Sequence, residues 1–570
     1  MEEFSRLCCL IVEDVYGGFL ARIFQQLSQL GRLSANQLAQ RCRLPLRHVK
    51  TGMAALIQLR LIYHHTTPDG LSTYQANTYN AYNLVRAGKL MALVERNLGP
   101  VAARIMKILN VLGSATAGEL ESRVFGDEAS GFKRKSAPLT NGFSDDRNEP
   151  GVDSRSKTYF RAMLRQLADK KYIVAVRDAH FQSLFDARQD VERHLRSLGT
   201  LPSGKGKKLQ SDIDEKVNAE LETRLDATVP TATILQEFET RSSNAETGNT
   251  SQDKTVLCIN YANLIVSIRN EKIASTAEKL FGNHTAQIAR AACLQIDIDS
   301  EPLKLQSSND PSASTHKLNM SRISHDLVDQ GTSNSFDESE ENGWPVGAHL
   351  ANGHHVYSTN GTKDLRDVEN HLAVLAEGPF SFFFREPKSD SWAIHKKKMD
   401  DFLRDRELIR LMGESLSGPA LRIIRMLIDK GKADEKTLQE VGLLGAKEVR
   451  RCLAQMQMMG FLELQEVPRE PQRQPNRTIF LWFYDAERVR KVFLGRLYKA
   501  MSRLFQHLQL ERGKLSSTLS KIERSDVQGS EPEMLSPAEL QVLYQWRQRE
   551  TWLLAEINRL DDSVAILRDL

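Results

Sequence analysis

One pattern of apolar residues occurs twice in this chain, 400 positions apart and without a gap. In residues 16–76, an apolar stripe at helical spacing ends at Gly31, Ser34 provides an N-cap for a short second helix, and Pro45 opens a third. A Pro-Asp-Gly turn then joins two short strand-like runs. Three short helices followed by a β-hairpin are typical of a winged helix.

The second occurrence covers residues 416–484. The paired positions, in chain order, are Ile23 and Ile423, Leu27 and Leu427, Gly31 and Gly431, Leu38 and Leu438, Leu44 and Leu444, Val49 and Val449, Met53 and Leu453, Leu56 and Met456, Leu59 and Met459, Leu61 and Phe461, and Ile62 and Leu462. Any amphipathic helix matches another by chance, but three helices and both turns are not expected to keep one register by chance. We therefore expect two copies of one small fold.

A further copy is expected after the first one. A shift of 82 pairs Ile23 with Ile105, and a shift of 111 pairs Leu56 with Leu167. The second and third helices of this copy are therefore separated by an insertion of 111 − 82 = 29 residues. Because the insertion is polar and rich in glycine, we expect residues 126–153 to be disordered.

A third, degraded copy is expected to begin with the run VLCINYANLIVSIRN as its first helix. A long stretch rich in Ser, Asn, Asp and Gly interrupts it at residues 297–366. Such a composition buries too little apolar surface to become ordered, so this stretch is also predicted to be disordered.

Beyond residue 485, apolar residues recur at heptad spacing in two long segments. Ser536 and Glu539 form a capping box at the start of the second segment. Two helices of similar length joined by a turn are expected to fold back as an antiparallel coiled-coil hairpin. The candidates for docking a protein partner on this hairpin are Leu494, Leu497, Met501, Leu504, Leu508, Trp546, Leu553 and Ile557.

The predicted fold is mostly α with small β wings. It consists of four tandem extended winged-helix domains followed by the C-terminal antiparallel coiled-coil hairpin, which suits a chain of 570 residues that is too long for one core. The predicted boundaries are 1–98 for the first winged helix, 99–200 for the second, 210–390 for the third, 400–484 for the fourth and 485–570 for the hairpin.

Composition and motifs point away from secreted proteins, membrane proteins and enzymes. No apolar run approaches the roughly 20 residues of a membrane helix, and the acidic start of the chain is unlike a secretory signal. The six cysteines are scattered without zinc-ligand spacing, and His64 and His65 are interpreted as a plain strand pair. Because there is no Walker loop, GxSxG or HExxH motif either, we expect no catalytic, cofactor or metal site.

Two groups of basic residues are candidates for contacts with DNA. The third helix carries Arg47, His48 and Lys50 in the first copy and Lys447, Arg450 and Arg451 in the fourth, but a solvated helix face is the favoured interpretation because neither cluster is dense. Flexible basic loops, which follow a distorted or melted duplex, are better candidates. Their residues are Lys133, Arg134, Lys135, Arg155, Lys157, Arg161, Arg469, Arg473 and Arg477. The alternative for these loops is a charged surface that only keeps the chain soluble. A net charge of +4 adds no indication of nucleic-acid binding.

The domain organisation of the chain resembles that of a known family, and the residues that match this family most clearly lie in the N-terminal part of the sequence. These residues are Leu7-Cys8, Glu13, Gly17, Gly31, Val49-Lys50, Leu56, Thr73-Tyr74-Gln75-Ala76 and Leu84-Val85-Arg86. The chain resembles the winged-helix subunit of the RNA polymerase III initiation heterotrimer, the third-largest-subunit family, which is related to the alpha subunit of general transcription factor E. The resemblance covers nearly the whole chain, apart from the two low-complexity insertions.

The resemblance implies a nuclear, non-catalytic subunit of DNA-directed RNA polymerase III, without a cofactor. Its implied partners are two heterotrimer subunits, the clamp of the largest subunit, the polymerase III initiation factor and promoter DNA. It would act in promoter opening and initiation at small non-coding RNA genes. Two alternatives remain open: a free-standing DNA-binding regulator, and a tandem winged-helix scaffold in another nuclear or cytoplasmic complex.

Overall fold

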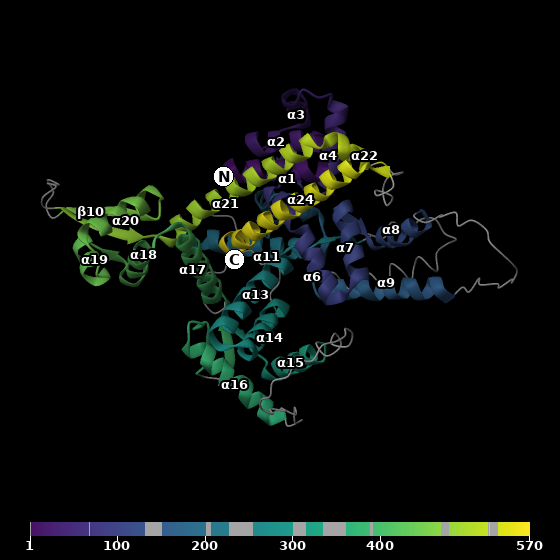
Figure 1. Ribbon diagram of the computed structural model, residues 1–570. Coiled ribbons are helices and arrows are strands. Elements are labelled where there is room, and N and C mark those ends of the chain that lie inside the picture. Colours follow the sequence, from purple (N-terminus) through teal and green to yellow (C-terminus); the bar gives the residue numbers. More distant parts are fainter. Residues whose placement is uncertain are drawn as a thin grey trace. The chain divides into compact units, whose positions relative to one another are not determined.

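The computed structural model describes residues 2–67, 69–130, 151–200, 207–226, 255–299, 315–333, 361–387, 391–468, 478–522, 524 and 534–570 (Figure 1). The chain divides into two compact units. The first comprises Met1–Leu264, Pro302–Leu305 and Gly495–Asp561, and the second comprises Ile265–Glu301, Gln306–Leu494 and Asp562–Leu570. Both are mostly helical with small antiparallel sheets. Among the described residues, none of the helices combines the length and apolarity that crossing a membrane requires.

The N-terminal part of the first compact unit alternates helices with short strands. Its elements are α1 (Glu2–Tyr16), α2 (Gly18–Leu30), α3 (Ala35–Cys42), α4 (Leu46–Gln58), β1 (Ile62–Thr66), β2 (Ser72–Ala76), α5 (Thr78–Asn83), the 3-10 helix η1 (Leu84–Arg86), α6 (Ala87–Leu98), α7 (Pro100–Leu112), β3 (Ser114–Thr116), α8 (Ala117–Ser130), α9 (Gly151–Asp169), β4 (Ile173–Val176), η2 (Asp178–Phe181), α10 (Leu184–Ser197), α11 (Lys207–Leu225) and β5 (Val256–Ile259).

The rest of the chain continues the same alternation and ends in long helices. Its elements are α13 (Ala262–Phe281), α14 (Asn283–Asp299), β6 (Thr315–Lys317), α15 (Met320–Ser333), α16 (Gly361–Glu377), β7 (Phe383–Arg385), β8 (Trp392–His395), α17 (Lys396–Ser415), α18 (Gly418–Lys430), β9 (Lys432–Ala433), α19 (Glu435–Gly442), α20 (Ala446–Met458), β10 (Leu462–Pro468), β11 (Thr478–Tyr484), α21 (Ala486–Lys514), α22 (Ser516–Ile522), α24 (Pro537–Val564) and the π-helix η5 (Ala565–Asp569).

The three helices and the hairpin predicted for residues 16–76 are present as α2, α3, α4, β1 and β2. Gly31 ends α2 at a positive φ of 81°, which favours glycine, and its N–H donates to the carbonyl of Leu27. Ser34 begins α3 through a capping box with Gln37. The three helices pack on one another around buried side chains such as Leu38.

The turn that follows the third helix has one geometry at three places in the chain. Arg60, Lys171 and Gly460 all have positive φ angles of 58°, 56° and 78°, and they are related by the predicted shifts of 111 and 400. In each case the N–H of the next residue donates to the carbonyl five residues earlier at 2.9 Å. Because this geometry belongs to the backbone, it supports the repeat independently of the apolar pattern.

The strands repeat one antiparallel order as well. A short strand pairs with the last strand of the hairpin, which in turn pairs with the first, giving the orders β3-β5-β4, β6-β8-β7 and β9-β11-β10. In the first copy, an isolated bridge between Leu33 and Tyr74 takes the place of the short strand.

The expected start of the third copy is wrong. The run VLCI forms strand β5, which pairs with β3 and β4 and so completes the second copy across the predicted border between residues 99–200 and 210–390. Among the described residues between the hairpin strands, the helices α10 and α11 pack on each other through residues such as Val191 and Val217. A short apolar run does not distinguish a buried strand from a helix by periodicity, which explains the error.

The three helices of the third copy are α14, α15 and α16, and they contact one another. Strand β6 of the third sheet lies between α14 and α15 in the chain. Strand β6 and helix α15 lie within residues 297–366, so the predicted disorder is wrong for them. Leu318 and Ile323 are buried there because they join the apolar core of the second compact unit. The surrounding Ser and Asn residues lowered the average apolarity and concealed this short stripe.

The other predicted insertion, residues 126–153, also needs correction at its edges. Helix α8 extends to Ser130 and α9 begins at Gly151, so both ends of the stretch are helical. Residues 131–150 lie outside the described part of the chain.

Helices α21 and α24 lie side by side and antiparallel (Figure 1). Arg512 pairs with Glu550 at 2.8 Å, and Lys521, which follows α21 on α22, pairs with Glu539 near the start of α24 at 2.6 Å. The capping box predicted for Ser536 and Glu539 is confirmed, because each backbone N–H bonds to the other side chain.

Candidate nucleic-acid and partner interfaces

Most of the basic loop residues predicted to contact DNA lie outside the described residues. This applies to Lys133, Arg134, Lys135, Arg469, Arg473 and Arg477, and the side chains of Arg155 and Lys157 on α9 lie outside as well. Arg161 is the member whose side chain is described, and its guanidinium lies 3.5 Å from the carboxylate of Glu121 on α8. That carboxylate partly offsets the charge that Arg161 presents to a phosphate.

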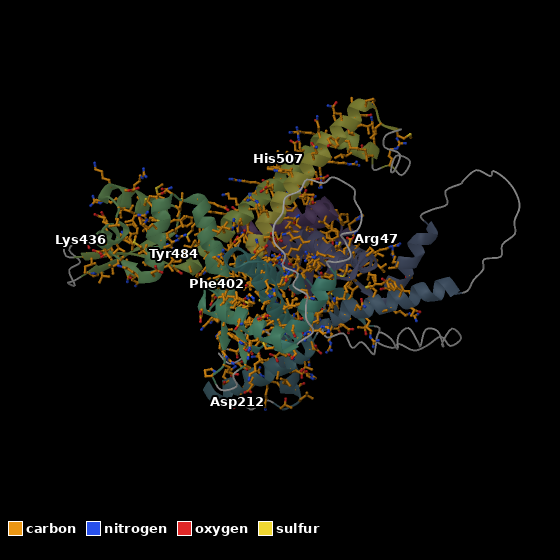
Figure 2. All side chains as sticks on the ribbon, turned by 60° about the horizontal axis from the view of Figure 1, so that its bottom comes forward. Arg47, Asp212, Phe402, Lys436, Tyr484 and His507 are labelled. Carbon is orange, nitrogen blue, oxygen red and sulfur yellow. The ribbon has the colours of Figure 1, made fainter. Side chains whose placement is uncertain are left out.

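The basic residues of the third helices are at the surface in both the first and the fourth copy. On α4, Arg47, His48 and Lys50 are exposed, and the side chain of Arg47 is labelled in Figure 2. On α20, Lys447, Arg450 and Arg451 are exposed, but Arg450 forms an ion pair with Glu435 of α19. The two helices therefore differ in how far their positive charge is compensated.

Sequence reasoning overlooked a signal that separates the two copies. No Asp or Glu occurs between Asp14 and Asp69, a stretch that contains six Arg and one Lys. The bulk net charge of +4 hides this local excess, because acidic residues elsewhere in the chain cancel it. Counting charges copy by copy would have found it.

The predicted partner-docking residues are mostly occupied by contacts within the chain. Six of them are at most 6% exposed: Leu497, Met501, Leu508, Trp546, Leu553 and Ile557. These six side chains are therefore buried by contacts within the chain, and their docking of a protein partner stays a prediction. Leu494 and Leu504 are partly exposed and stay candidates, and Phe505 takes the buried position expected for Leu504.

The apolar face of residues 495–514 of α21 is covered by helices of the first copy, all within the first compact unit. Phe4 of α1 packs on Tyr498 with ring centroids 4.9 Å apart, and the hydroxyl of Tyr82 on α5 lies 3.7 Å from the Met501 sulfur. Arg512 of α21 also pairs with Asp14 of α1. The heptad pattern thus serves the chain's own core in addition to the helix pair.

A buried ionic cluster joins α24 to the helices that follow the first hairpin. The carboxylate of Asp561 accepts hydrogen bonds from Arg86 Nε at 2.9 Å, Tyr82 OH at 2.9 Å and Lys89 Nζ at 3.0 Å. The side chains of Arg86 and Asp561 are fully buried. Burial alone would raise the pKa of Asp561, but the charges of Arg86 and Lys89 hold this pKa below its usual value.

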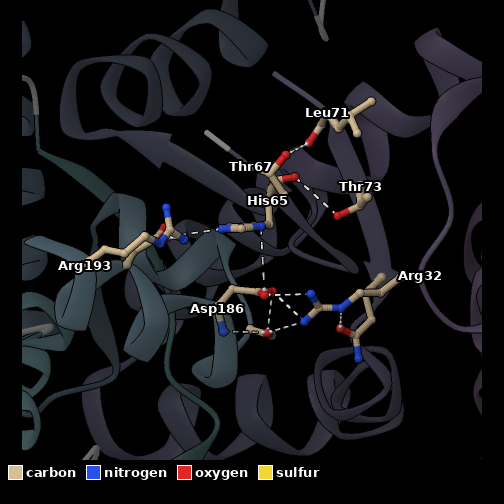
Figure 3. Close-up of polar contacts among 10 residues, drawn as sticks. Arg32, His65, Thr67, Leu71, Thr73, Asp186 and Arg193 are labelled. Carbon is tan, nitrogen blue, oxygen red and sulfur yellow. Dashed lines mark hydrogen bonds and ion pairs between the residues drawn. The ribbon is translucent and has the colours of Figure 1, made fainter. Parts of the chain in front are cut away.

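A second polar network joins the first hairpin to helix α10 (Figure 3). The two terminal guanidinium nitrogens of Arg32, Nη1 and Nη2, bond to the carboxylate of Asp186, at 2.7 and 2.8 Å. The Nε2 atom of His65 on β1 lies 3.2 Å from Asp190, which also pairs with Arg193. His65 is therefore held between carboxylates of α10. Across the described residues, no three His, Cys, Asp or Glu side chains are grouped so as to hold a metal ion.

Three family models match this chain. The model described as the RNA polymerase III subunit RPC82 helix-turn-helix domain matches residues 6–67, and the one described as RNA polymerase III subunit RPC82 matches residues 162–403. The POLR3C C-terminal winged-helix domain matches residues 410–484, which contain the fourth copy.

Curated relatives match along the whole chain. The chain is 32% identical to the DNA-directed RNA polymerase III subunit rpc3 of Ajellomyces capsulatus and 33% identical to that of Aspergillus niger. It is 32% identical to subunit RPC-3 of Coccidioides immitis. Each alignment covers 99% of this chain and 99% of the relative.

Proposed function

The chain belongs to the family of the DNA-directed RNA polymerase III subunit rpc3, and from this premise we propose that it is a non-catalytic subunit that acts in promoter opening and transcription initiation at small non-coding RNA genes. A role as a subunit of RNA polymerase III follows from the family. The observation that carries the proposal is the likeness over 99% of both chains. Because it runs from end to end, it concerns the whole chain and not one shared domain.

The proposed architecture is four tandem winged-helix domains followed by a coiled-coil hairpin. The repeated strand order and the repeated left-handed turn support the tandem copies. The antiparallel ion pairs between the C-terminal helices support the hairpin. Repeated small folds joined in one chain provide several separate faces for contacts with proteins and DNA, which suits a subunit that bridges partners.

The proposed partners are the two other heterotrimer subunits, the clamp of the largest subunit, the initiation factor and promoter DNA, all in the nucleus. Large exposed apolar side chains support contacts with proteins, because they are costly to leave in water. Trp552 of α24 is 61% exposed and Leu510 of α21 is 65% exposed. Leu443 and Met458 of the fourth copy are 87% and 90% exposed.

The experiment that tests this function is affinity purification of the chain, tagged at its own locus, followed by mass spectrometry, with an untagged strain as the control. We expect the catalytic subunits of RNA polymerase III in the eluate. Co-purification of a different complex without polymerase subunits would favour the scaffold alternative. Recovery of the chain alone, with tight binding to duplex DNA and a steep salt dependence, would favour the free-standing regulator.

A further inference from the structure

The first and fourth copies share one fold but differ sharply in charge. The stretch between Asp14 and Asp69 has six Arg, one Lys and no acidic residue. The equivalent positions 415–468 have eight basic and seven acidic residues, a net charge of +1. Because both sequences adopt the same three helices and hairpin, the fold itself does not require the positive charge of the first copy.

Two of the basic side chains of the first copy are used inside the chain. Arg32 is bound to Asp186, and Arg60 Nη1 lies 2.6 Å from the Cys258 sulfur. Four others are exposed, and no ion pair involves them within the described part of the chain: Arg41, Arg43, Arg47 and Lys50. Four uncompensated cations close together raise the local positive potential at the surface.

These four residues surround a single turn between two helices. Arg41 is in the last turn of α3, and Arg43 caps that helix in the left-handed conformation with a φ of 52°. Arg47 and Lys50 follow in the first turns of α4. In a helix-turn-helix bound to DNA, the first helix crosses the phosphate backbone and the N-terminal part of the second enters the major groove. The four cations are in the positions that such docking places near phosphates.

We propose that the α3–α4 turn of the first copy is the face on which this chain binds duplex DNA, through phosphate contacts of Arg41, Arg43, Arg47 and Lys50. This assignment rests on the proposed function, which it deepens by naming the copy that holds the DNA. Phosphate contacts fix the position of a protein on a duplex without reading its sequence. That suits the proposed contact with promoter DNA of varied sequence.

The fourth copy keeps two of these four cations, because Lys447 and Arg450 stand at the positions of Arg47 and Lys50, but Arg450 is paired with Glu435. Val441 and Leu443 replace Arg41 and Arg43, and Leu443 has the same φ of 52° with 87% exposure. Glu448 stands where the first copy has His48. The corresponding turn is therefore apolar and mixed in charge, so the fourth copy provides a matched control within the chain.

The test measures binding of the full chain to a fluorescein-labelled DNA duplex of random sequence by anisotropy over a series of salt concentrations. One variant combines Arg43→Gln, Arg47→Gln and Lys50→Gln. The control combines Lys447→Gln, Arg450→Gln and Arg451→Gln, which removes the same number of charges from the fourth copy. Thermal unfolding monitored by circular dichroism checks that both variants fold, as expected for exposed side chains.

Each phosphate neutralised contributes about 0.9 to the slope of log K against log salt concentration, so the first variant is expected to reduce the slope by about 2.7. The control variant is expected to leave the slope unchanged. An unchanged slope in the first variant, or an equal reduction in both, would overturn the assignment. Co-purification of each variant with polymerase subunits is measured in parallel, so a failure of this assignment is distinguishable from a failure of the proposed function.

Discussion

Replacing Asp561 by Asn is the perturbation for which the structure gives the clearest magnitude. The variant keeps the shape of the side chain but removes the charge that faces Arg86, whose guanidinium is fully buried. Leaving one partner of a buried ion pair uncompensated costs about 3–5 kcal/mol. The loss of the Lys89 ion pair adds less to this cost, because the Lys89 side chain is 19% exposed and water solvates its ammonium group. We therefore expect a loss of at least about 3 kcal/mol where α24 meets η1.

Hydrogen exchange followed by mass spectrometry measures this loss locally, which is preferable because a chain of several domains does not unfold in a single step. Because about 1.4 kcal/mol corresponds to a factor of ten, amide protection in residues 78–98 and 553–564 is expected to fall about 100-fold. Residues 418–458, which belong to the second compact unit, are expected to keep their protection.

Arg559→Gln serves as the matched control on the same helix, because it removes an ion pair with Glu556 in which the Arg559 side chain is 67% exposed. Exposed ion pairs contribute little to stability, so the amide protection of the Arg559→Gln variant is expected to match that of the wild type. The double variant Arg86→Met with Asp561→Asn is expected to lose less stability than the sum of the single changes, because no buried charge is left unpaired. Equal protection in Asp561→Asn and Arg559→Gln would refute the role given to this cluster.

The pH dependence of this contribution follows from the lowered pKa of Asp561. A carboxyl whose pKa is lowered by folding stabilises the folded state fully at pH values above its pKa in the unfolded chain, which is about 3.9. The contribution is lost as the pH falls through the folded value, because the protonated group no longer balances Arg86. Protection near α24 is therefore expected to be flat from neutral pH down to about 5 and to fall only in stronger acid.

Three further outcomes are expected. Leu508→Asp should disrupt the C-terminal helix pair and weaken association with the polymerase. Leu504→Asp should have a much smaller effect, because Leu508 is fully buried and Leu504 is partly exposed. Equal co-purification of the polymerase with the two variants would contradict this expectation. Asp186→Asn should loosen the contact of Arg32 with α10 and increase hydrogen exchange in residues 62–76, and unchanged exchange there would count against the network. Replacing Lys133, Arg134 and Lys135 with Gln should reduce promoter opening, measured by a permanganate footprint, while the polymerase still assembles. Full opening with this variant would exclude the loop as a candidate DNA contact.

Local sequence signals were sufficient to predict the helix boundaries in the copies that no insertion interrupts. Gly31, the N-cap at Ser34 and the capping box at Ser536 each specify a helix end within a few residues, and the structure confirms them. The end of the second copy was harder to predict, because its last strand, β5, follows the inserted helices α10 and α11 and pairs with residues of β4 that lie 80 to 86 positions earlier. Periodicity carries no information about such distant pairing.

The interfaces depend even more on distant residues. Asp561 meets Arg86 across 475 positions, and Asp186 meets Arg32 across 154, so neither cluster is visible in a local pattern. The heptad positions were predicted correctly as apolar, but their burial against α1 and α5 depends on the tertiary fold. The charge of the α3–α4 turn of the first copy was overlooked, although its signal, the local absence of acidic residues, is present in the sequence.

The central claim is that repeated small domains grip DNA and neighbouring subunits during initiation without performing the chemistry. Transcription by polymerase III depleted of this chain, compared on a closed promoter duplex and on a template with a pre-opened bubble, tests it most directly. We predict that RNA synthesis is lost on the closed duplex, retained on the open template, and restored on the duplex when the chain is added back. Equal loss on both templates, or full activity on the closed duplex, would contradict the claim.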